Sequence, residues 1–151
     1  MATHELAQVN IARFLGPLDS PVMREFADNL DRINALADAS PGFCWRLQTE
    51  EGNAMDLRLF EDDLFVNLST WTDLESLKHF VYRTVHVELL KRRHEWAHRM
   101  ELAHLALWWV PAGHQPSLEE TRDRLELLRA EGATPEAFTF HTHFPAPTGQ
   151  A

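Results

Sequence analysis

The run ELAQVNIARF at residues 5–14 decides the fold of this chain, because its side chains alternate between apolar and polar along its length. Val9 and Ile11 fall on one side of the run, and Gln8 and Asn10 fall on the other. A period of two residues is typical of a half-buried β-strand. The run therefore predicts a first strand with one apolar and one polar side.

Three further runs alternate in the same way and extend the sheet. In the first of them, alternation predicts that Phe43, Trp45 and Leu47 share one side, opposite Arg46. A weaker strand is predicted at residues 57–60. The three runs are FCWRLQ at 43–48, LFVNLSTW at 64–71 and HLALWWV at 104–110.

Apolar residues at helical spacing fill the intervals between these strands. Asp19-Ser20-Pro21 predicts a helix start, with Val22 as the first inward residue, and the helix ends before Pro41-Gly42. A second helical region begins after Thr72-Asp73 and extends to about residue 99. The β-branched residues Thr84-Val85 predict a bend within it.

The C-terminal part of the chain predicts a helix and a packed tail. Ser117 and Glu120 have the spacing of a capping box, which predicts a helix over 118–131 that Gly132 ends. The tail from Thr134 is too apolar to be a loose end, and we expect it to pack on the body. Its aromatic residues are Phe138, Phe140 and Phe144.

The order strand, helix, strand, strand, helix, strand predicts an α+β fold of the ferredoxin-like, split βαβ type. We expect one domain over residues 1–151, with its core at about 5–111 and the extra helix and tail at 112–151. The two helices of this plan are expected to cover one face of the sheet.

The other face is predicted to be polar and aromatic, too aromatic to stand open to water. A second copy of the chain is its natural cover, so we expect a homodimer that forms a dimeric α/β barrel. The residues of this face are Gln8, Asn10, Arg46, Gln48, Phe65, Asn67, Ser69, Trp71 and one of Trp108 and Trp109.

Charge and composition exclude several classes of partner. Fourteen Lys and Arg against 23 Asp and Glu give a net charge of -9, which repels a phosphate backbone and argues against nucleic acid. No run approaches the ~18 apolar residues of a membrane span, and the first residues show no basic segment followed by an apolar one, the pattern of a signal peptide. We expect a cytoplasmic protein with no membrane partner. Cys44, the only cysteine, can form neither an intrachain disulfide nor a thiolate cluster.

Two basic residues, His86 and Arg93, interrupt the apolar side of the second helical region. Histidine titrates near neutral pH and a guanidinium group binds anionic oxygens, so the pair predicts an acid/base group and an anion-holding group. The alternative is structural: Arg93 pairs with a buried carboxylate or extends to water, and His86 is a hydrogen-bonded core histidine.

Polar and aromatic side chains complete the candidate site. The amides of Asn10 and Asn67, on neighbouring strands, can hydrogen-bond a polar ligand atom, with Asn10 taking part in catalysis. The alternatives are amides satisfied by nearby groups and aromatic side chains that fill the core or an interface. The aromatic residues predicted to line the site are Phe65, Trp71, Trp96 and Trp108.

The nine histidines do not form a metal-ligand set by spacing. His94 and His98 lack the glutamate of the zincin pattern, and His141 and His143 are a doublet in the tail. No metal is therefore expected. The chain also has no Gly-x-Gly-x-x-Gly, phosphate-binding loop or Gly-x-Ser-x-Gly, so dinucleotide, nucleotide and serine-hydrolase functions find no support.

Several runs of this sequence resemble a bacterial family of unknown function, numbered 3291. The resemblance implies the dimeric α/β-barrel superfamily, whose members of known chemistry include antibiotic-biosynthesis monooxygenases and small haem-degrading monooxygenases. Asn10 is similar to the haem degraders' strand asparagine and His86 to their helical histidine ligand, whereas their helical tryptophan falls near Phe80. The runs are LAQVNIAR (6–13), INALADASPGFCWRLQ (33–48), FVYRTVH (80–86), LALWWVPAGHQP (105–116) and PEAFTF (135–140).

The sequence thus supports one main hypothesis and two alternatives. The main hypothesis is a small-molecule enzyme with a monooxygenase-like activity on an aromatic or polycyclic substrate, needing no organic cofactor. In it His86 is the acid/base, Arg93 holds an enolate oxygen, and Asn10 and Asn67 orient the substrate. The alternatives are a non-catalytic homodimer that binds haem or another small ligand, and a purely structural homodimer.

Overall fold

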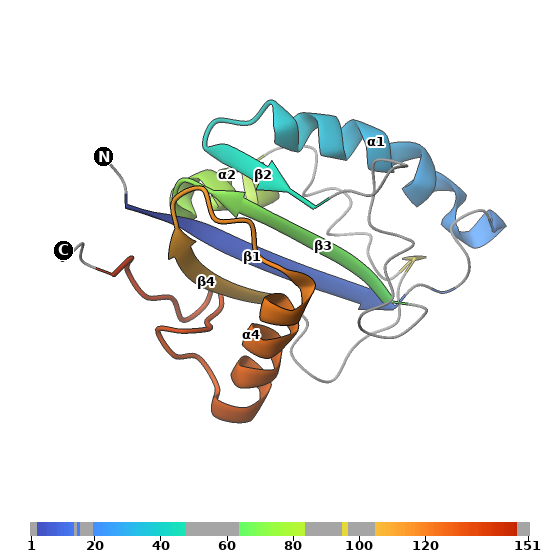
Figure 1. Ribbon diagram of the computed structural model, residues 1–151. Helices are drawn as coiled ribbons and strands as arrows, with labels where there is room; N and C mark the ends of the chain where they lie inside the picture. Colours follow the sequence, from blue (N-terminus) through green and yellow to red (C-terminus); the bar gives the residue numbers. More distant parts are fainter. Residues whose placement is uncertain are drawn as a thin grey trace.

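The computed structural model describes residues 3–13, 15, 20–47, 64–83, 95–96 and 105–147. The predicted order of strands and helices is confirmed (Figure 1). The strand predicted at 57–60 and, except for residues 95–96, the helical region predicted beyond Arg83 lie outside the described residues. The elements are β1 (His4–Arg13), the 3-10 turn η1 (Pro21–Met23), α1 (Arg24–Asp38), β2 (Phe43–Arg46), β3 (Leu64–Trp71), α2 (Leu74–Arg83), β4 (Leu105–Pro111) and α4 (Leu118–Glu131).

The four strands form one antiparallel sheet in the order β2-β3-β1-β4. The first strand lies inside the sheet, paired on one side with β3 and on the other with β4. Together with the order of helices along the chain, this is the ferredoxin-like α+β fold. The chain adds α4 and a tail after it, as the sequence predicts.

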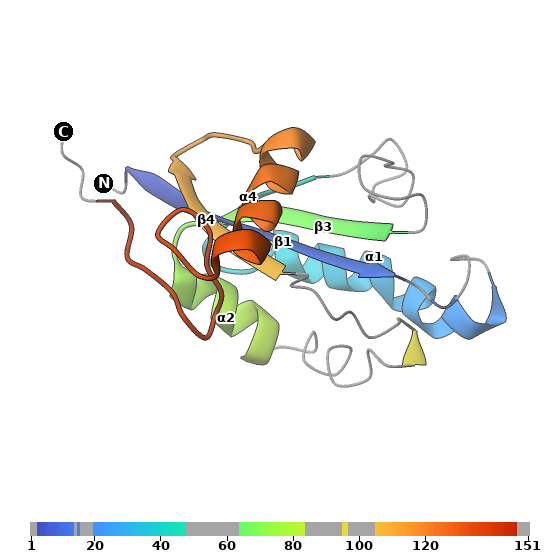
Figure 2. The same cartoon turned by 90° about the horizontal axis from the view of Figure 1, so that it is seen from below.

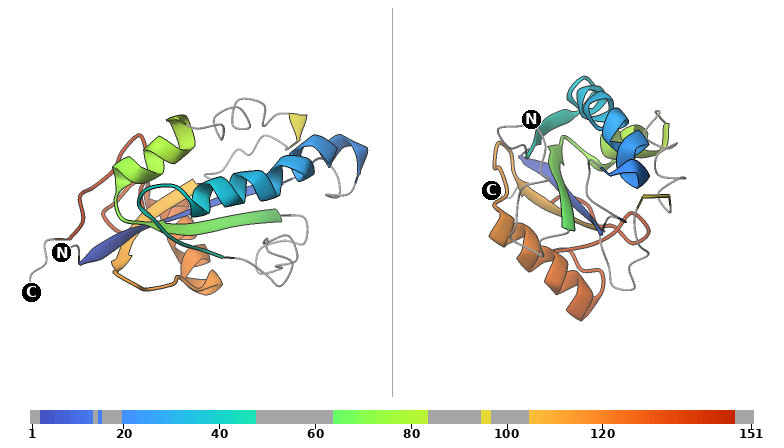
Figure 3. Two further views of the ribbon diagram at one scale, coloured as in Figure 1. Left: turned by 90° about the horizontal axis from the view of Figure 1, so that it is seen from above. Right: turned by 90° about the vertical axis from the view of Figure 1, so that its right-hand side faces the viewer.

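Helices lie on both faces of the sheet, with α1 and α2 on one side and α4 on the other (Figure 3). The assignment of faces expected from the sequence is therefore wrong. Asn67, Ser69 and Trp71 of the polar face lie toward α1 and α2, and the apolar residues of the same strands lie toward α4. The helices of the same chain cover both faces, so neither face needs a second copy as its cover.

The α4-facing side is apolar and closely packed. Leu125 and Leu128 of α4 and Ala137 of the tail pack against it. The apolar residues that β1, β3 and β4 contribute to this side are at most 2% exposed, so it supplies a continuous hydrophobic core. These strand residues are Ala7, Val9 and Ile11 of β1, Val66 and Leu68 of β3, and Ala106, Trp108 and Val110 of β4.

A bulge in β2 changes which side its residues face. Phe43 pairs with Trp71 and Trp45 pairs with Thr70, with a register shift between them. Two residues of β2 thus oppose one residue of β3, and every later side chain of β2 moves to the other side of the sheet. Phe43 packs toward α2 and Trp45 toward α4, so the prediction that they share a side is wrong.

The start of η1 and both ends of α4 follow the local sequence signals, but one inward residue was predicted wrongly. Pro21 starts η1, but the 3-10 geometry buries Met23 completely and leaves Val22 44% exposed, so Val22 is not the first inward residue. At α4, the Ser117 side chain accepts a hydrogen bond from the backbone N–H of Glu120, and Gly132 ends the helix with φ 76°. The cap and the stop of α4 are confirmed.

The predicted packing of the tail is also confirmed. Phe138 is fully buried, and its backbone pairs with that of Leu107 on the outer edge of β4. Figure 2 shows the tail passing from α4 along β4 toward α2. Among the described residues, no helix has the length and apolar character that crossing a membrane requires.

Candidate functional site

A chain of hydrogen bonds connects four side chains on the side of the sheet that faces α1 and α2. We call this side the helix-facing side, in contrast to the α4-facing side. The indole N–H of Trp71 donates to Ser69 Oγ at 2.9 Å. Gln8 Nε2 donates to the same oxygen at 2.8 Å and to Asn67 Oδ1 at 2.7 Å. Gln8, Ser69 and Trp71 are all under 8% exposed, so the chain is fixed inside the molecule. We call Gln8, Asn10, Asn67 and Ser69 the amide cluster.

The direction of these bonds determines what the amide cluster offers to a ligand. Ser69 Oγ accepts two hydrogen bonds, so its remaining capacity is to donate through its own O–H. Asn67 uses its oxygen to accept from Gln8, which leaves its two amide N–H groups as donors. Asn67 is exposed, although it lies in the interior of a strand. The buried chain therefore ends in hydrogen-bond donors that solvent or a ligand can reach.

Asn10 lies directly beside this accessible end. It pairs with Asn67 across β1 and β3, and with Leu105 across β1 and β4. Directly opposite residues of two strands carry their Cβ atoms about 4.5–5.5 Å apart, so the two amides can contact one ligand atom. Asn10 is half-buried. The structure thus brings together both asparagines that the sequence predicted.

Trp71 has a structural role as well as its polar contact. Its ring stacks on Phe80 of α2 at 5.3 Å and meets the edge of Phe43 at 5.4 Å. It is 1% exposed. The ring is therefore core, and only its N–H, through Ser69, contributes to the amide cluster.

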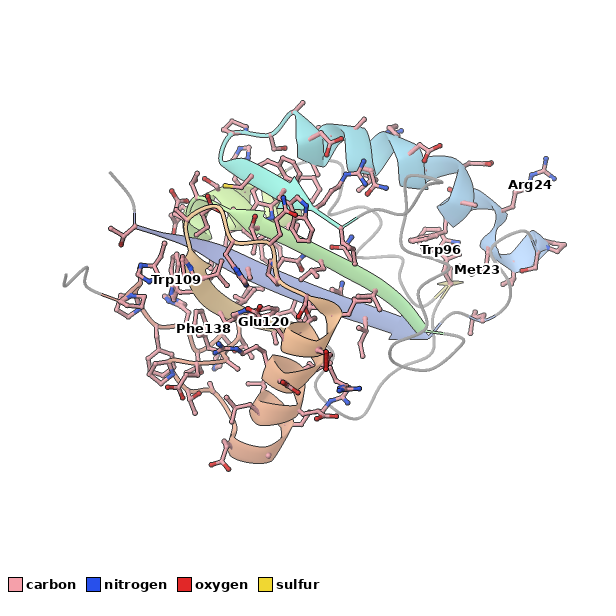
Figure 4. All side chains as sticks on the ribbon, viewed as in Figure 1. Met23, Arg24, Trp96, Trp109, Glu120 and Phe138 are labelled. Atoms are coloured by element: carbon pink, nitrogen blue, oxygen red, sulfur yellow. The ribbon has the colours of Figure 1, made fainter. Side chains whose placement is uncertain are left out.

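Trp96 lies near the start of α1, beside Met23 (Figure 4). It is 4% exposed, its ring is 5.6 Å from that of Phe26, and its carbonyl accepts from Leu15 N. Apolar side chains lie at both ends of the layer between α1 and the sheet, and the amides lie between those two ends. Trp96 forms part of one apolar end.

Trp108 lies on the opposite, α4-facing side and is not brought together with the amide cluster. Its indole N–H donates to Glu120 Oε2 at 3.0 Å, and His114 Nε2 lies 2.7 Å from Glu120 Oε1. Burial raises the pKa of Glu120, but the hydrogen bonds from His114 and Trp108 and the charges of His114 and Arg124 outweigh it and hold that pKa below 4.5. Trp108 thus anchors α4 to the sheet. The tryptophan of β4 on the helix-facing side is Trp109.

Three predicted site residues have no described side chain. His86 and Arg93 lie outside the described residues, and of Phe65 the structure describes only its place in β3, opposite Ala12. Gln8 and Ser69 were predicted for the polar face but not for the site. The signal that points to them is the period of two, which places both on the polar side of their strands. The register of β1 and β3 then pairs Gln8 with Ser69.

The described residues give no support to a metal site or to haem binding at the amide cluster. No group of three or more His, Cys, Asp or Glu side chains in this part of the chain is arranged to hold a metal ion. The amide cluster offers amides and a hydroxyl, which are not the imidazole, thiolate or thioether ligands of haem iron. The amide cluster therefore gives no support to the haem alternative, and His86, the ligand that the resemblance implies, lies outside the described residues.

The Cys44 thiol is poorly suited to nucleophilic chemistry. Burial, followed by the charge and hydrogen bond of Glu5 and the charge of Asp73, raises the pKa of Cys44 to about 11. A thiol is reactive as its thiolate, and at neutral pH this side chain is protonated.

Residues 5–151 match the profile of a family described as Domain of unknown function (DUF3291). No functionally curated protein matches the sequence. Among solved structures, the chain is similar to the NE2512 protein of unknown function from Nitrosomonas europaea, with 14% identity and a TM-score of 0.48 over 78% of this chain and 99% of that one. It is also similar to SnoaB, a cofactor-independent oxygenase from Streptomyces nogalater, with 16% identity and a TM-score of 0.48 over 74% of this chain and 95% of that one.

Proposed function

We propose that this chain, which belongs to the DUF3291 family, binds a small organic molecule at the amide cluster through an oxygen atom of that molecule. The observation that carries the proposal is the buried chain of hydrogen bonds that ends at the exposed amide of Asn67, opposite Asn10. A protein that needed only a stable core would place apolar side chains at these positions, as the α4-facing side does.

The chemistry of the cluster favours an oxygen that accepts hydrogen bonds. Because Gln8 occupies the oxygen of Asn67, the groups left to a ligand are the amide N–H donors of Asn67 and the O–H of Ser69. Carbonyl, phenolate and enolate oxygens are acceptors that such donors recognise. The apolar cluster on the same side of the sheet, which includes the half-buried Leu105 opposite Asn10, favours an aromatic or polycyclic molecule over a sugar or a peptide.

The activity that we propose at this site is monooxygenase-like. Donors placed at a phenolate or enolate oxygen stabilise the electron-rich form of an aromatic substrate, which is the form that reacts with oxygen. Asn10 and Asn67 would orient that oxygen. His86 as the acid/base and Arg93 as the anion-holding group complete the proposal, and their side chains lie outside the described residues.

A pair of ligands that differ only in one oxygen acceptor tests the binding proposal. We expect 1-acetylnaphthalene to bind about fivefold to tenfold more tightly than 1-ethylnaphthalene in calorimetric titrations, the worth of one hydrogen bond. Asn67→Asp replaces the N–H donors by an acceptor and should abolish the preference. Gln115→Glu, on the exposed loop before α4, is the matched control and should keep it. Equal affinity of the two ligands for the unchanged protein contradicts the proposal.

A second assay tests the activity. We expect the protein to convert 1,5-dihydroxynaphthalene and O2 to the hydroxynaphthoquinone and water, a reaction in which one oxygen atom enters the ring and the other leaves in water. Oxygen uptake and quinone absorbance should rise in proportion to protein concentration, and Asn10→Ala should lower both. Turnover that is equal with Asn10→Ala would contradict the role of Asn10, and absent turnover in a protein that binds the ketone would leave a binding function without catalysis.

The homodimer expected from the sequence is a separate proposal. Within the described residues, both sheet faces lie under helices of the same chain, so an interface would have to form elsewhere on the surface. Light scattering at micromolar concentration gives the answer directly. Twice the chain mass supports the dimer, and a single chain mass removes it.

A further inference from the structure

The tail, residues Thr134–Pro147, connects the two sides of the sheet around the edge of β4. After a tight turn closed between Thr134 and Ala137, Phe138 exchanges two backbone hydrogen bonds with Leu107, each of 2.8 Å. Farther along, the indole N–H of Trp109 donates to the carbonyl of Phe144 at 2.9 Å. The tail is thus attached to β4 at two points.

The aromatic side chains of the tail pack into the helix-facing layer. Phe138 is fully buried in the same cluster as Trp71 and Phe80, and its ring lies 5.8 Å from that of Phe144. Phe140 meets Tyr82 of α2 edge to face at 5.7 Å. The tail therefore spans from β4 to α2 (Figure 2), on the β4 side of the layer that contains the amide cluster.

The register of the sheet locates this closure relative to the amide cluster. Leu107, the partner of Phe138, is also the partner of Gln8 on β1, and Leu105 is the partner of Asn10. The bridge between Phe138 and Leu107 is antiparallel, so the tail leaves it in the direction of Leu105, and Phe140 lies in the turn that Thr139 and Thr142 then close. Phe140 and Leu105 are both half-buried and pack against the same cluster.

We propose that the tail is the wall of the amide cluster on the β4 side, and that Phe140 sets the size of the ligand the site admits. This inference rests on the proposed binding function, because it defines the boundary of the same site. A rigid aromatic wall excludes a larger ring system by steric overlap, whereas truncation of that wall makes room for it.

Labelling of an introduced thiol tests the wall without any ligand. Asn10→Cys is made in a Cys44→Ala background, and the rates of modification by N-ethylmaleimide and by the bulky N-(1-pyrenyl)maleimide are compared. We expect Phe140→Ala to raise the pyrenyl-to-ethyl rate ratio about tenfold. His141→Ala, an exposed neighbour in the tail, should leave the ratio unchanged.

A second substitution and a ligand pair make the outcome decisive. Phe140→Leu keeps an apolar side chain and should raise the ratio less than Phe140→Ala; if the alanine variant does not fold, the leucine variant decides. In the unmodified Asn10 background, Phe140→Ala should improve binding of 1-acetylpyrene relative to 1-acetylnaphthalene. A rate ratio that neither Phe140 variant changes overturns the proposal. If neither ketone binds the unchanged protein, the proposed function fails, while the labelling ratios still decide whether Phe140 is a wall.

Discussion

The two sides of the same four strands differ in chemistry, although each is covered by helices of the same chain. The buried strand residues of the α4-facing side are apolar except for Thr70. The helix-facing side carries a hydrogen-bonded row from Trp71 to Asn67 in the middle of an otherwise aromatic layer. Buried polar groups stabilise a fold less than apolar packing does, so their concentration on one side indicates a purpose other than stability.

The largest effect that distinguishes the two sides should come from α4. Leu125 is fully buried against the sheet, and Leu125→Ala should lower the free energy of unfolding by about 2–5 kcal/mol. Asn67→Asp, at the exposed end of the amide cluster, keeps the oxygen that accepts from Gln8 and should change it by less than about 0.5 kcal/mol. Urea denaturation measures both. A loss of stability at Asn67 as large as that at Leu125 would remove the contrast.

Two threonines on the α4-facing side should respond with opposite signs to the same substitution. Thr70 Oγ1 is buried and has no hydrogen-bond partner among the described residues, so Thr70→Val should raise the free energy of unfolding by about 1 kcal/mol. Thr121 is equally buried, but its hydroxyl donates to the Ser117 carbonyl at 2.8 Å, so Thr121→Val should lower it by about 1 kcal/mol. We expect Thr70→Val to raise the melting temperature by about 2–4 °C and Thr121→Val to lower it by about the same amount. The same sign for both substitutions would contradict this reading of Thr70.

A smaller effect should appear at the contact between Glu120 and the sheet. Because the folded state lowers the pKa of Glu120, the ionised carboxylate stabilises the fold above its unfolded pKa, and this stability is lost as pH falls through the folded value. Glu120→Gln should therefore lower the free energy of unfolding at pH 7 by under about 1 kcal/mol and lower the melting temperature with it. The difference in stability between the two proteins should vanish in acid. Melts between pH 3 and pH 7 measure it. A difference that grows in acid would have the wrong sign.

The smallest changes in stability are expected at His86 and Arg93, if they serve the helix-facing side. His86→Ala and Arg93→Met should then weaken binding of 1-acetylnaphthalene and leave the melting temperature almost unchanged. If Arg93 instead pairs with a buried carboxylate, its replacement should cost about 3–5 kcal/mol. Large losses of stability in both variants, with unchanged binding, would assign them to the core.

The sequence predicts the elements of this fold well and the layers poorly, for a physical reason. Period-two and capping patterns are local, so β1, β3, β4 and α4 are found within one or two residues. Which side faces which helix depends on long-range packing. The apolar side appeared to need α1 and α2, whereas α4 covers it, and a single bulge before Trp45 reversed the sides of β2.

The same limit applies to the candidate site. Asn10 and Asn67 were predicted together because alternation aligns them across two strands. Trp108 was assigned to the wrong group because two adjacent tryptophans of β4 face opposite sides, and only the register with Ala7 and Leu6 distinguishes them. The direction of the hydrogen-bond chain through Gln8 and Ser69 depends on side-chain geometry, which no sequence pattern specifies.

The most direct test of the proposed binding side uses two indole groups as reporters, one on each side of the sheet. Trp71 Nε1 donates to Ser69 on the helix-facing side, and Trp108 Nε1 donates to Glu120 on the α4-facing side. In a nitrogen-15 NMR titration with 1-acetylnaphthalene, the Trp71 indole and the Asn67 side-chain amide should shift together and saturate, while the Trp108 indole stays in place. A saturable shift of Trp108 alone, or no shift at Asn67, would contradict binding at the amide cluster.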